Sequence, residues 1–260
     1  MARYRVILAY DGTDFYGFQR QASDPNKRTV QGVVETALRQ AGWQGRSILG
    51  AGRTDTGVHA SGQVIAFDLD WAHSPQALQA ALNSRLPPDV AVQAAYPVAP
   101  DFHPRYDALA RRYRYCLFCQ PERDPLRERY AWRVWPPVAD LTPLAKIWLG
   151  AHDFAAFGSP AKPGGSTLRT VLFAEWQDHR DEWIFEIQAD AFLYRMVRRL
   201  VYVQVAAGQG RVQAEALAQA LQGRTRESSR GVSRGIQDVP MGAAPASGLT
   251  LVEVRYDSLV

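Results

Sequence analysis

Residues 50–60 read GAGRTDTGVHA, a glycine-framed loop that carries one carboxylate, Asp55, two positions after a guanidinium, Arg53. Glycines permit turns that other residues cannot adopt, and they let another group approach the backbone closely. Loops on a rigid scaffold often carry binding and catalytic residues, so Asp55 is the first candidate for chemistry. The simpler alternative is a hairpin connection in which Asp55 only stabilises the turn.

The glycine spacing does not indicate a nucleotide cofactor. Gly50 and Gly52 resemble the start of a dinucleotide-binding fingerprint, but that motif has a third glycine where this chain has Asp55. The fingerprint also requires a helix after the loop, whereas residues 62–68 predict a strand. A Gly-Lys-Ser/Thr sequence of the phosphate-binding type does not occur in the chain. We therefore expect no cofactor of this kind.

The composition is that of an ordinary globular protein. The 260 residues are 47% hydrophobic and 22% charged, enough for one large domain or two smaller ones. No apolar run approaches the roughly 20 residues of a membrane-spanning helix. The N-terminal residues predict a strand rather than a signal peptide. We therefore expect a cytoplasmic protein that does not contact a membrane.

The basic side chains are concentrated rather than spread evenly. Since the formal net charge is only +4, their distribution says more than their total. The arginines gather as Arg105, Arg111, Arg112 and Arg114, then Arg195, Arg198 and Arg199, then Arg224, Arg226, Arg230 and Arg234, with Tyr106, Tyr113, Tyr115 and Tyr194 among them. Arginine binds phosphate and aromatic rings stack on unpaired bases, so this pattern favours an RNA partner over scattered surface charge.

The two cysteines do not predict a metal or redox site. Cys116 and Cys119 have the C-x-x-C spacing of half a zinc site or a redox pair. They fall in an expected strand, where residues three apart point to opposite faces. A second Cys/His pair that would complete a metal site is missing from the sequence. We expect both cysteines to be core residues and expect no metal.

Apolar periodicity predicts strands and helices in both halves of the chain. In the first half, the expected strands are residues 4–10, 62–68, 90–96 and 106–118, and helices are expected after Thr29 (30–38) and after Ser74. In the second half, helices are expected at 142–149, 192–207 and 214–221, hairpin strands at 171–177 and 183–188, a flexible basic segment at 224–235 and a last strand at 249–256.

This order of elements is typical of the α+β class, with helices on one face of a mostly antiparallel sheet. Because the second half repeats the mixture of strands and helices of the first, we expect two similar halves, residues 1–105 and 106–260, with a cleft between them. The first half would carry the Asp55 loop. The second would carry the tyrosine- and arginine-rich segments.

Five segments of the chain resemble, in order, the motifs of the tRNA pseudouridine synthase A (TruA) family. They are residues 10–21 (YDGTDFYGFQRQ), 50–60, 102–115 (FHPRYDALARRYRY), 191–198 (AFLYRMVR) and 244–249 (APASGL). The resemblance implies the pseudouridine synthase fold and a homodimer. It also implies a cofactor-free isomerase that converts uridine to pseudouridine at positions 38 to 40 of the tRNA anticodon stem-loop.

The resemblance assigns the central roles to three residues. Asp55 would be the catalytic carboxylate, either attacking C1′ of the ribose as a nucleophile or removing the 2′ proton as a base. The sequence leaves these two mechanisms open. Arg198 would pair with Asp55, because an ionised carboxylate in a closed site needs a cation. Tyr113 would stack on the target base and assist the transfer of its C5 proton.

Further residues of the same motifs are candidates for substrate binding. Leu249 would close an apolar wall against the base, and Arg53 would hold a phosphate or enter the stem while the uridine is turned out. Arg20, Arg105 and Arg112 complete the predicted substrate-binding set. Two positions depart from the family pattern and bear on the shape of the pocket: Tyr202, where glycine is common, and Thr250, where an aromatic residue is common.

Two other classes of protein would require sequence features that differ from those of a pseudouridine synthase. A non-catalytic RNA-binding or tRNA-folding protein on the same fold would be indicated by the loss of Asp55, Tyr113 or Arg198, and all three are present. A zinc-dependent base deaminase would need His-x-Glu and Pro-Cys-x-x-Cys, and neither sequence occurs.

Overall fold

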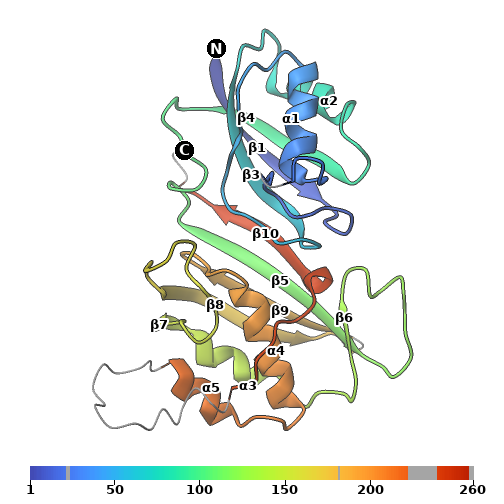
Figure 1. The fold of residues 1–260 in the computed structure, drawn as a ribbon, viewed down its shortest axis with the longest axis vertical. Helices are drawn as coiled ribbons and strands as arrows, with labels where there is room; N and C mark the ends of the chain where they lie inside the picture. Colours follow the sequence, from blue (N-terminus) through green and yellow to red (C-terminus); the bar gives the residue numbers. More distant parts are fainter. Residues whose placement is uncertain (22–23, 181, 222–238, 258–260) are drawn as a thin grey trace. The chain divides into compact units, whose positions relative to one another are not determined.

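The computed structural model describes residues 1–21, 24–180, 182–221 and 239–257. The chain forms two compact units, one made of residues 1–111 together with 250–260 and the other of residues 112–249. Both units combine a sheet with helices, so the predicted α+β class is confirmed (Figure 1). The expected segment 224–235 lies outside the described residues.

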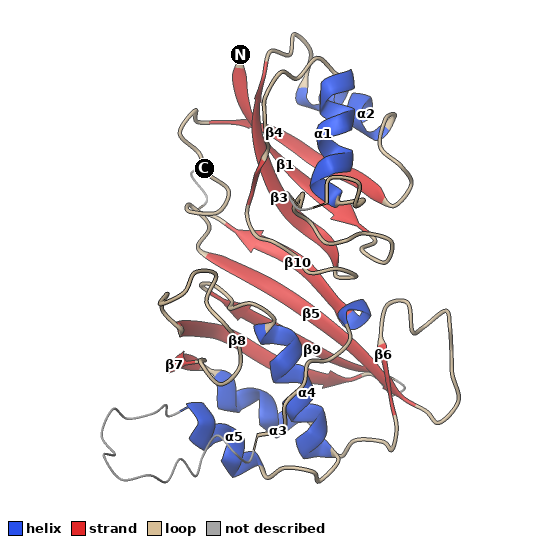
Figure 2. Ribbon diagram, in the orientation of Figure 1, coloured by secondary structure: helices blue, strands red, loops and turns tan. Residues whose placement is uncertain are grey.

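The first unit is a sheet with two helices on one face (Figure 2). Its strands are β1 (Ala2–Tyr10), β3 (His59–Leu69), β4 (Val90–Val98) and β10 (Leu249–Arg255), in the spatial order β4-β1-β3-β10, and its helices are α1 (Val30–Gln40) and α2 (Pro75–Asn83). β1 pairs antiparallel with both β3 and β4, whereas β10 runs parallel to β3. The two-residue strand β2 (Leu49–Gly50) pairs with β3 just before the Asp55 loop.

Local sequence signals account for the elements of this unit. The Thr29 hydroxyl accepts a hydrogen bond from Gly32 N at the start of α1, and Ser74 caps α2 with proline in the first turn. Along β1 every second residue is buried, from Tyr4 to Tyr10, as expected for a strand with one face on the core.

The second unit also consists of strands and helices, and the helices complete its core. Its strands are β5 (Ala110–Cys119), β9 (Trp183–Ala189), β8 (Leu168–Asp178) and β7 (Gly150–Asp153), in the order β5-β9-β8-β7, with β6 (Trp132–Val134) parallel to β5. Its helices are α3 (Thr142–Ala145), the 3₁₀-helix η1 (Lys146–Trp148), α4 (Met196–Gly208) and α5 (Ala214–Leu221). β8 and β9 form the predicted antiparallel hairpin. Large aromatic side chains such as Trp148, Trp176 and Phe185 are fully buried here.

The return of the chain to the first unit is a feature of the fold that the sequence did not suggest. Residues 250–257 leave the second unit, and β10 aligns Thr250 with His59 and Leu251 with Ala60 of β3. The expected division lay at residue 105, slightly before the observed change of unit at residue 111, and it assigned the last strand to the second half.

Helix α4 begins four residues later than the periodicity predicts. Arg195 adopts a left-handed backbone conformation (φ 59°), which a helix interior does not permit. Just before it, Tyr194 N donates to Ser159 O at 2.9 Å, so this residue forms a bridge to a distant loop instead of a helical turn. Tyr194 therefore lies before α4 and does not share a helix face with Arg198.

Two other elements are shorter than predicted. β5 begins at Ala110 rather than at residue 106, because residues 103–107 form a turn in which the Asp107 carboxylate accepts from His103 N at 2.8 Å. The helix expected at 142–149 ends as α3 at Ala145 and continues only as the 3₁₀-helix η1. The late start of β5 follows from a local hydrogen bond that apolar periodicity does not register.

The two cysteines lie on β5, but both are half-buried free thiols rather than the core residues that the sequence predicted. Burial raises the pKa of the Cys116 thiol to about 11, so it is protonated at neutral pH. None of the helices in the described part of the chain has the length and hydrophobicity that a membrane crossing needs.

Candidate active site

The Asp55 loop connects β2 to β3 in the first unit. A turn closes it, since Val58 N donates to Asp55 O at 3.1 Å, and Gly57 takes a positive φ of 79° that suits glycine. The Asp55 side chain is half-buried and that of Arg53 is exposed. The loop therefore presents its carboxylate at the surface of the unit on a fixed backbone.

The N-terminal motif holds this loop through backbone hydrogen bonds. Phe18 N donates to Thr54 O at 3.1 Å, and Gly57 N donates to Phe15 O at 3.4 Å. Both phenylalanine side chains are buried, so the segment that makes these bonds is itself anchored in the core. Two motifs that are 30 or more residues apart in the sequence thus form one local structure.

Two glycines of the N-terminal motif are required by this close approach. A Cβ atom on Gly12 would lie 2.0 Å from Val58 O, and one on Gly17 would lie 2.8 Å from Thr54 O. Gly17 also has a positive φ of 83°. A larger residue at either position would push the N-terminal motif away from the Asp55 loop.

Arg111 links the second motif to the same loop within the first unit. Its guanidinium donates to Ala51 O at 3.2 Å and to Arg105 O at 2.6 Å. The Arg105 side chain itself is exposed, as a phosphate-binding residue would be. One arginine of the predicted basic cluster is therefore structural, and its neighbour is available at the surface.

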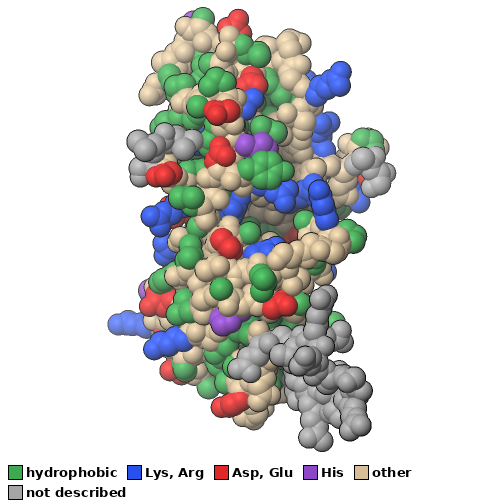
Figure 3. Space-filling model, turned by 90° about the vertical axis from the view of Figure 1, so that its left-hand side faces the viewer, with side chains coloured by type: hydrophobic (Ala, Val, Ile, Leu, Met, Phe, Trp, Pro, Cys, Tyr) green, Lys and Arg blue, Asp and Glu red, His purple; other side chains and the backbone are tan. Residues whose placement is uncertain are grey.

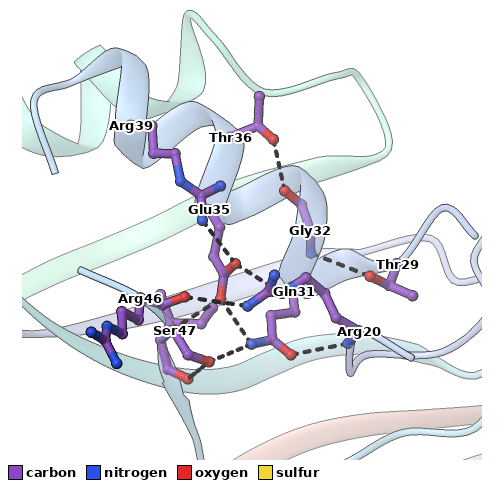
Figure 4. Close-up of polar contacts among 10 residues, drawn as sticks. Arg20, Thr29, Gln31, Gly32, Glu35, Thr36, Arg39, Arg46 and Ser47 are labelled. Carbon is purple, nitrogen blue, oxygen red and sulfur yellow. Dashed lines mark hydrogen bonds and ion pairs between the residues drawn. The ribbon is translucent and has the colours of Figure 1, made fainter. Parts of the chain in front are cut away.

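Arg20, a predicted substrate-binding residue, belongs to a polar network around the buried carboxylate of Glu35 (Figure 4). Its Nε atom lies 3.0 Å from Glu35, and its terminal nitrogen donates to Arg46 O at 3.2 Å. Glu35 also accepts from Ile48 N at 3.2 Å and from Gln31 at 2.8 Å. The network ties α1 to the N-terminal motif and to the segment that leads into β2.

We expect Glu35→Ala to lower the free energy of unfolding by about 2 kcal/mol, because it leaves the buried Ile48 N–H without its acceptor and removes one of the two hydrogen bonds that the Gln31 amide donates. Urea denaturation measures this change. Arg39→Ala is the matched control, since it removes a half-exposed ion pair to the same carboxylate at 3.4 Å and a cation–π contact with Trp43 at 5.6 Å, and it should cost less than about 1 kcal/mol. Equal losses in the two variants would contradict a structural role for Glu35.

In the second unit, Tyr113 and Tyr115 alternate with Arg112 and Arg114 on β5. Tyr113 is half-buried and packs edge-on against Phe192, with ring centroids 5.0 Å apart. Arg112 and Arg114 both form ion pairs with Glu186, so these two arginines share one face of the strand. The Arg112 guanidinium, predicted to bind substrate, is thus already paired within this unit.

Arg198 lies in the first turn of α4 and contacts the C-terminal motif. Its Nε atom donates to Ala244 O at 2.7 Å, and Ala244 N donates to Arg198 O at 2.9 Å. The next residue, Arg199, donates to Ala156 O and Gly242 O, and burial lowers its pKa. Both arginines are held in place by backbone carbonyls rather than extending freely from a helix surface.

The C-terminal motif also contacts β5. The Tyr115 hydroxyl donates to Pro245 O at 2.9 Å, and a Cβ atom on Gly248 would lie 2.6 Å from the Tyr115 ring. Leu249, the predicted apolar wall, is buried directly after this glycine. Within the second unit, three motifs therefore meet: the one with Tyr113, the one with Arg198 and the one with Leu249.

The predicted site residues are thus divided between the two units. Asp55, Arg53, Arg20 and Arg105 belong to the first unit, and Tyr113, Arg198, Leu249 and Arg112 to the second. Figure 3 shows one face of the molecule, on which Lys and Arg side chains are interspersed with acidic and hydrophobic ones. The third arginine cluster, Arg224 to Arg234, lies outside the described residues.

Sequence reasoning missed the residues that hold the two groups in place. Tyr115, Arg111 and Thr54 were quoted in the motifs, yet no positioning role was predicted for them. Tyr115 could have been identified, because it is a polar residue of a motif that also falls on the buried face of a strand.

Comparisons with known proteins agree with these observations. A family model described as tRNA pseudouridine synthase matches residues 6–107 and 144–257. The tRNA pseudouridine synthase A of Limosilactobacillus fermentum is 37% identical, over 99% of this chain and 97% of its own. That of Solidesulfovibrio magneticus is 40% identical, over 98% of this chain and 92% of its own. The chain belongs to the tRNA pseudouridine synthase family.

Among solved structures, a chain of the archaeal box H/ACA sRNP Nop10-Cbf5 complex aligns with 78% of this chain and 43% of its own length. The sequence identity is 10% and the TM-score is 0.35, which is too low to support an argument about the fold. The assignment rests on the family model and on the curated relatives, which agree over nearly the whole chain.

Proposed function

We propose that this protein converts uridine to pseudouridine at positions 38 to 40 of the tRNA anticodon stem-loop, with Asp55 as the catalytic carboxylate. Membership of the tRNA pseudouridine synthase family makes it an isomerase that acts on uridine in tRNA. The observation that carries the role of Asp55 is the construction of its loop. The backbone is held by the N-terminal motif, and Asp55 is the one acidic residue between Arg53 and His59.

The reaction requires three changes at the uridine. The bond between N1 and C1′ breaks, the base turns, and a bond forms between C5 and C1′ while the C5 proton leaves and N1 gains a proton. Asp55 either forms a covalent bond to C1′ or removes the 2′ proton to give a glycal-like intermediate. Both routes need an ionised carboxylate on a rigid loop, and both conserve the atoms of the substrate.

Arg198 and Tyr113 complete the proposed catalytic set. Arg198 would stabilise the ionised carboxylate of Asp55, since guanidinium keeps its charge and binds a carboxylate through two parallel hydrogen bonds. Its anchoring to Ala244 O supports a fixed position for this group. Tyr113 would stack on the base and assist the C5 proton transfer, and its half-buried ring against Phe192 supports such a stacking role.

The remaining proposed contacts concern the RNA. A paired and stacked uridine hides its glycosidic bond, so the base must be turned out of the stem. The exposed side chains of Arg53 and Arg105 would bind phosphates during this step, and Leu249 would contact the base. We also propose, from the family resemblance, that the protein is cytoplasmic and acts as a homodimer.

The direct test uses unmodified tRNA transcripts. After incubation with the protein, pseudouridine is mapped by chemical adduct formation and reverse transcription, and stops are expected at positions 38 to 40. Transcripts with cytidine at these positions serve as the control. A protein that binds the tRNA but leaves every uridine unchanged would instead be an RNA-binding or tRNA-folding protein.

We expect the affinity for tRNA to fall steeply between low and physiological salt, because phosphate contacts release counterions. Filter binding at several salt concentrations measures the slope of log K against log salt. Arg53→Ala should reduce the magnitude of this slope by about one unit, which is the contribution of one phosphate contact. Arg85→Ala, in the turn just after α2, is the control and should leave it unchanged, because this guanidinium contacts Ala81 O and Ser84. A slope near zero for the unmodified protein would contradict an electrostatic interface.

A further inference from the structure

Three polar side chains from three separate segments are joined by hydrogen bonds next to the backbone that leads into Asp55. The Tyr10 hydroxyl at the end of β1 lies 2.8 Å from the hydroxyl of Thr54, the residue before Asp55. The Gln63 amide on β3 donates to the Tyr10 hydroxyl at 3.4 Å and to Gly52 O at 3.1 Å. We call these three residues, Tyr10, Thr54 and Gln63, the loop anchor.

The loop anchor is buried. Gln63 is 0% exposed, Tyr10 is 4% exposed and Thr54 is 6% exposed. Burial raises the pKa of Tyr10 to about 12, so its hydroxyl keeps its proton at physiological pH. A buried hydroxyl or amide group that has no hydrogen-bond partner costs free energy. The hydrogen bonds between these three side chains therefore favour this arrangement over one in which the bonds are broken.

The anchor fixes the backbone on the N-terminal side of Asp55. Thr54 is held at its side chain by Tyr10 and at its carbonyl by Phe18 N, 3.1 Å away. Gly52, two residues earlier, is held at its carbonyl by Gln63. The peptide that leads into Asp55 therefore has little freedom to rotate, and the direction in which the carboxylate points depends on these bonds.

We infer that Tyr10, Thr54 and Gln63 are positioning residues for the reaction, holding the Asp55 carboxylate at the angle that the ribose requires. This inference rests on the proposed role of Asp55. A displacement of about 1 Å at a reacting group can reduce a rate by up to about 100-fold, so a bond one residue away from Asp55 affects the chemical step. It should not affect RNA affinity, since the three side chains are buried.

The test compares variants that remove a hydroxyl with little change of shape. Thr54→Val and Tyr10→Phe should each lower the single-turnover rate at saturating tRNA by about 10-fold, with the Kd for tRNA unchanged within about 2-fold. The double variant should be about as slow as Tyr10→Phe alone, because that single change already removes the bond to Thr54 as well as the one from Gln63. Thr54→Ser keeps the hydroxyl and should retain most of the rate.

Tyr4→Phe is the matched control. Tyr4 is also buried on the core face of β1, and removal of its hydroxyl leaves the loop anchor intact. Equal rates for Thr54→Val and Thr54→Ser, or equal losses for Tyr10→Phe and Tyr4→Phe, would overturn the inference. Asp55→Asn, measured in parallel, separates the two proposals: if it remains active, the role of Asp55 is wrong, whatever the anchor variants do.

Discussion

Asp55→Asn is expected to lower pseudouridine formation by at least about 1,000-fold while leaving the fold and the affinity for tRNA nearly unchanged. The amide has the shape of the carboxylate but can neither attack C1′ nor accept the 2′ proton. The loop itself should persist, because backbone atoms of Phe15, Phe18 and Thr54 hold it. Single-turnover assays with labelled tRNA measure the rate, and thermal unfolding checks the fold.

Asp14→Asn is the control for this experiment. Asp14 is an exposed carboxylate in the N-terminal motif, next to the segment that holds the Asp55 loop. Its replacement makes the same chemical change and should leave the rate within about 2-fold of the unmodified protein. Activity of Asp55→Asn within about 10-fold of the unmodified protein would remove Asp55 from the mechanism, because loss of an essential nucleophile or base costs far more.

Arg198→Met is expected to lose nearly all activity, and Arg198→Lys is expected to retain a measurable part of it. Lysine keeps a positive charge, but it lacks the planar fork that binds a carboxylate through two hydrogen bonds. It also lacks the Nε atom that donates to Ala244 O at 2.7 Å. Arg211→Met, which alters an exposed arginine just after α4, should be fully active. Single-turnover rates at saturating tRNA rank the variants.

Stability measurements test whether Arg198 acts on Asp55 itself. If the two charges stabilise each other, Asp55→Ala and Arg198→Met together should cost less stability than the sum of the single changes. Chemical denaturation of the four proteins provides this comparison. Additive losses together with an active Arg198→Met would assign the cation to Arg53 or Arg195 instead.

The elements that the sequence predicted well are those that local signals determine. Helices α1 and α2 begin where Thr29 and Ser74 accept hydrogen bonds from the next turn, and such caps are visible in the sequence. The hairpin of β8 and β9 follows from the alternation of apolar residues on either side of a polar turn. In these segments a few neighbouring residues decide the structure.

The elements that differed depend on residues far away in the chain. Tyr194 pairs with Ser159, and this bond competes with the first turn of the expected helix. β10 pairs with β3 across almost 200 positions of sequence, which no local pattern records. Long-range pairing is decided by the whole sheet, so apolar periodicity could not assign the last strand to the first unit.

The candidate site also contains parts that local sequence determines and parts that depend on distant residues. The motif around Asp55 could be found from the sequence because the residues are contiguous. The loop anchor could not, since Tyr10 and Thr54 are 44 positions apart and Tyr10 and Gln63 are 53 apart. One sequence shows which residues are chemically able to react. The structure shows which other residues hold the reactive side chains in position.

The return of β10 to the first unit has a consequence for the order in which the protein can be completed during synthesis. Until residues 249–255 have been synthesised, the first residues of β3 lack the neighbour that β10 provides, and a strand with an unpaired edge can pair with other chains. The hydrogen bond from the Tyr256 hydroxyl to Pro104 O, 2.7 Å long, also forms only after this return. The nascent first unit therefore stays unfinished while residues 112–248 are made, and termination within that span would release a chain whose β3 lacks its β10 partner and is prone to association.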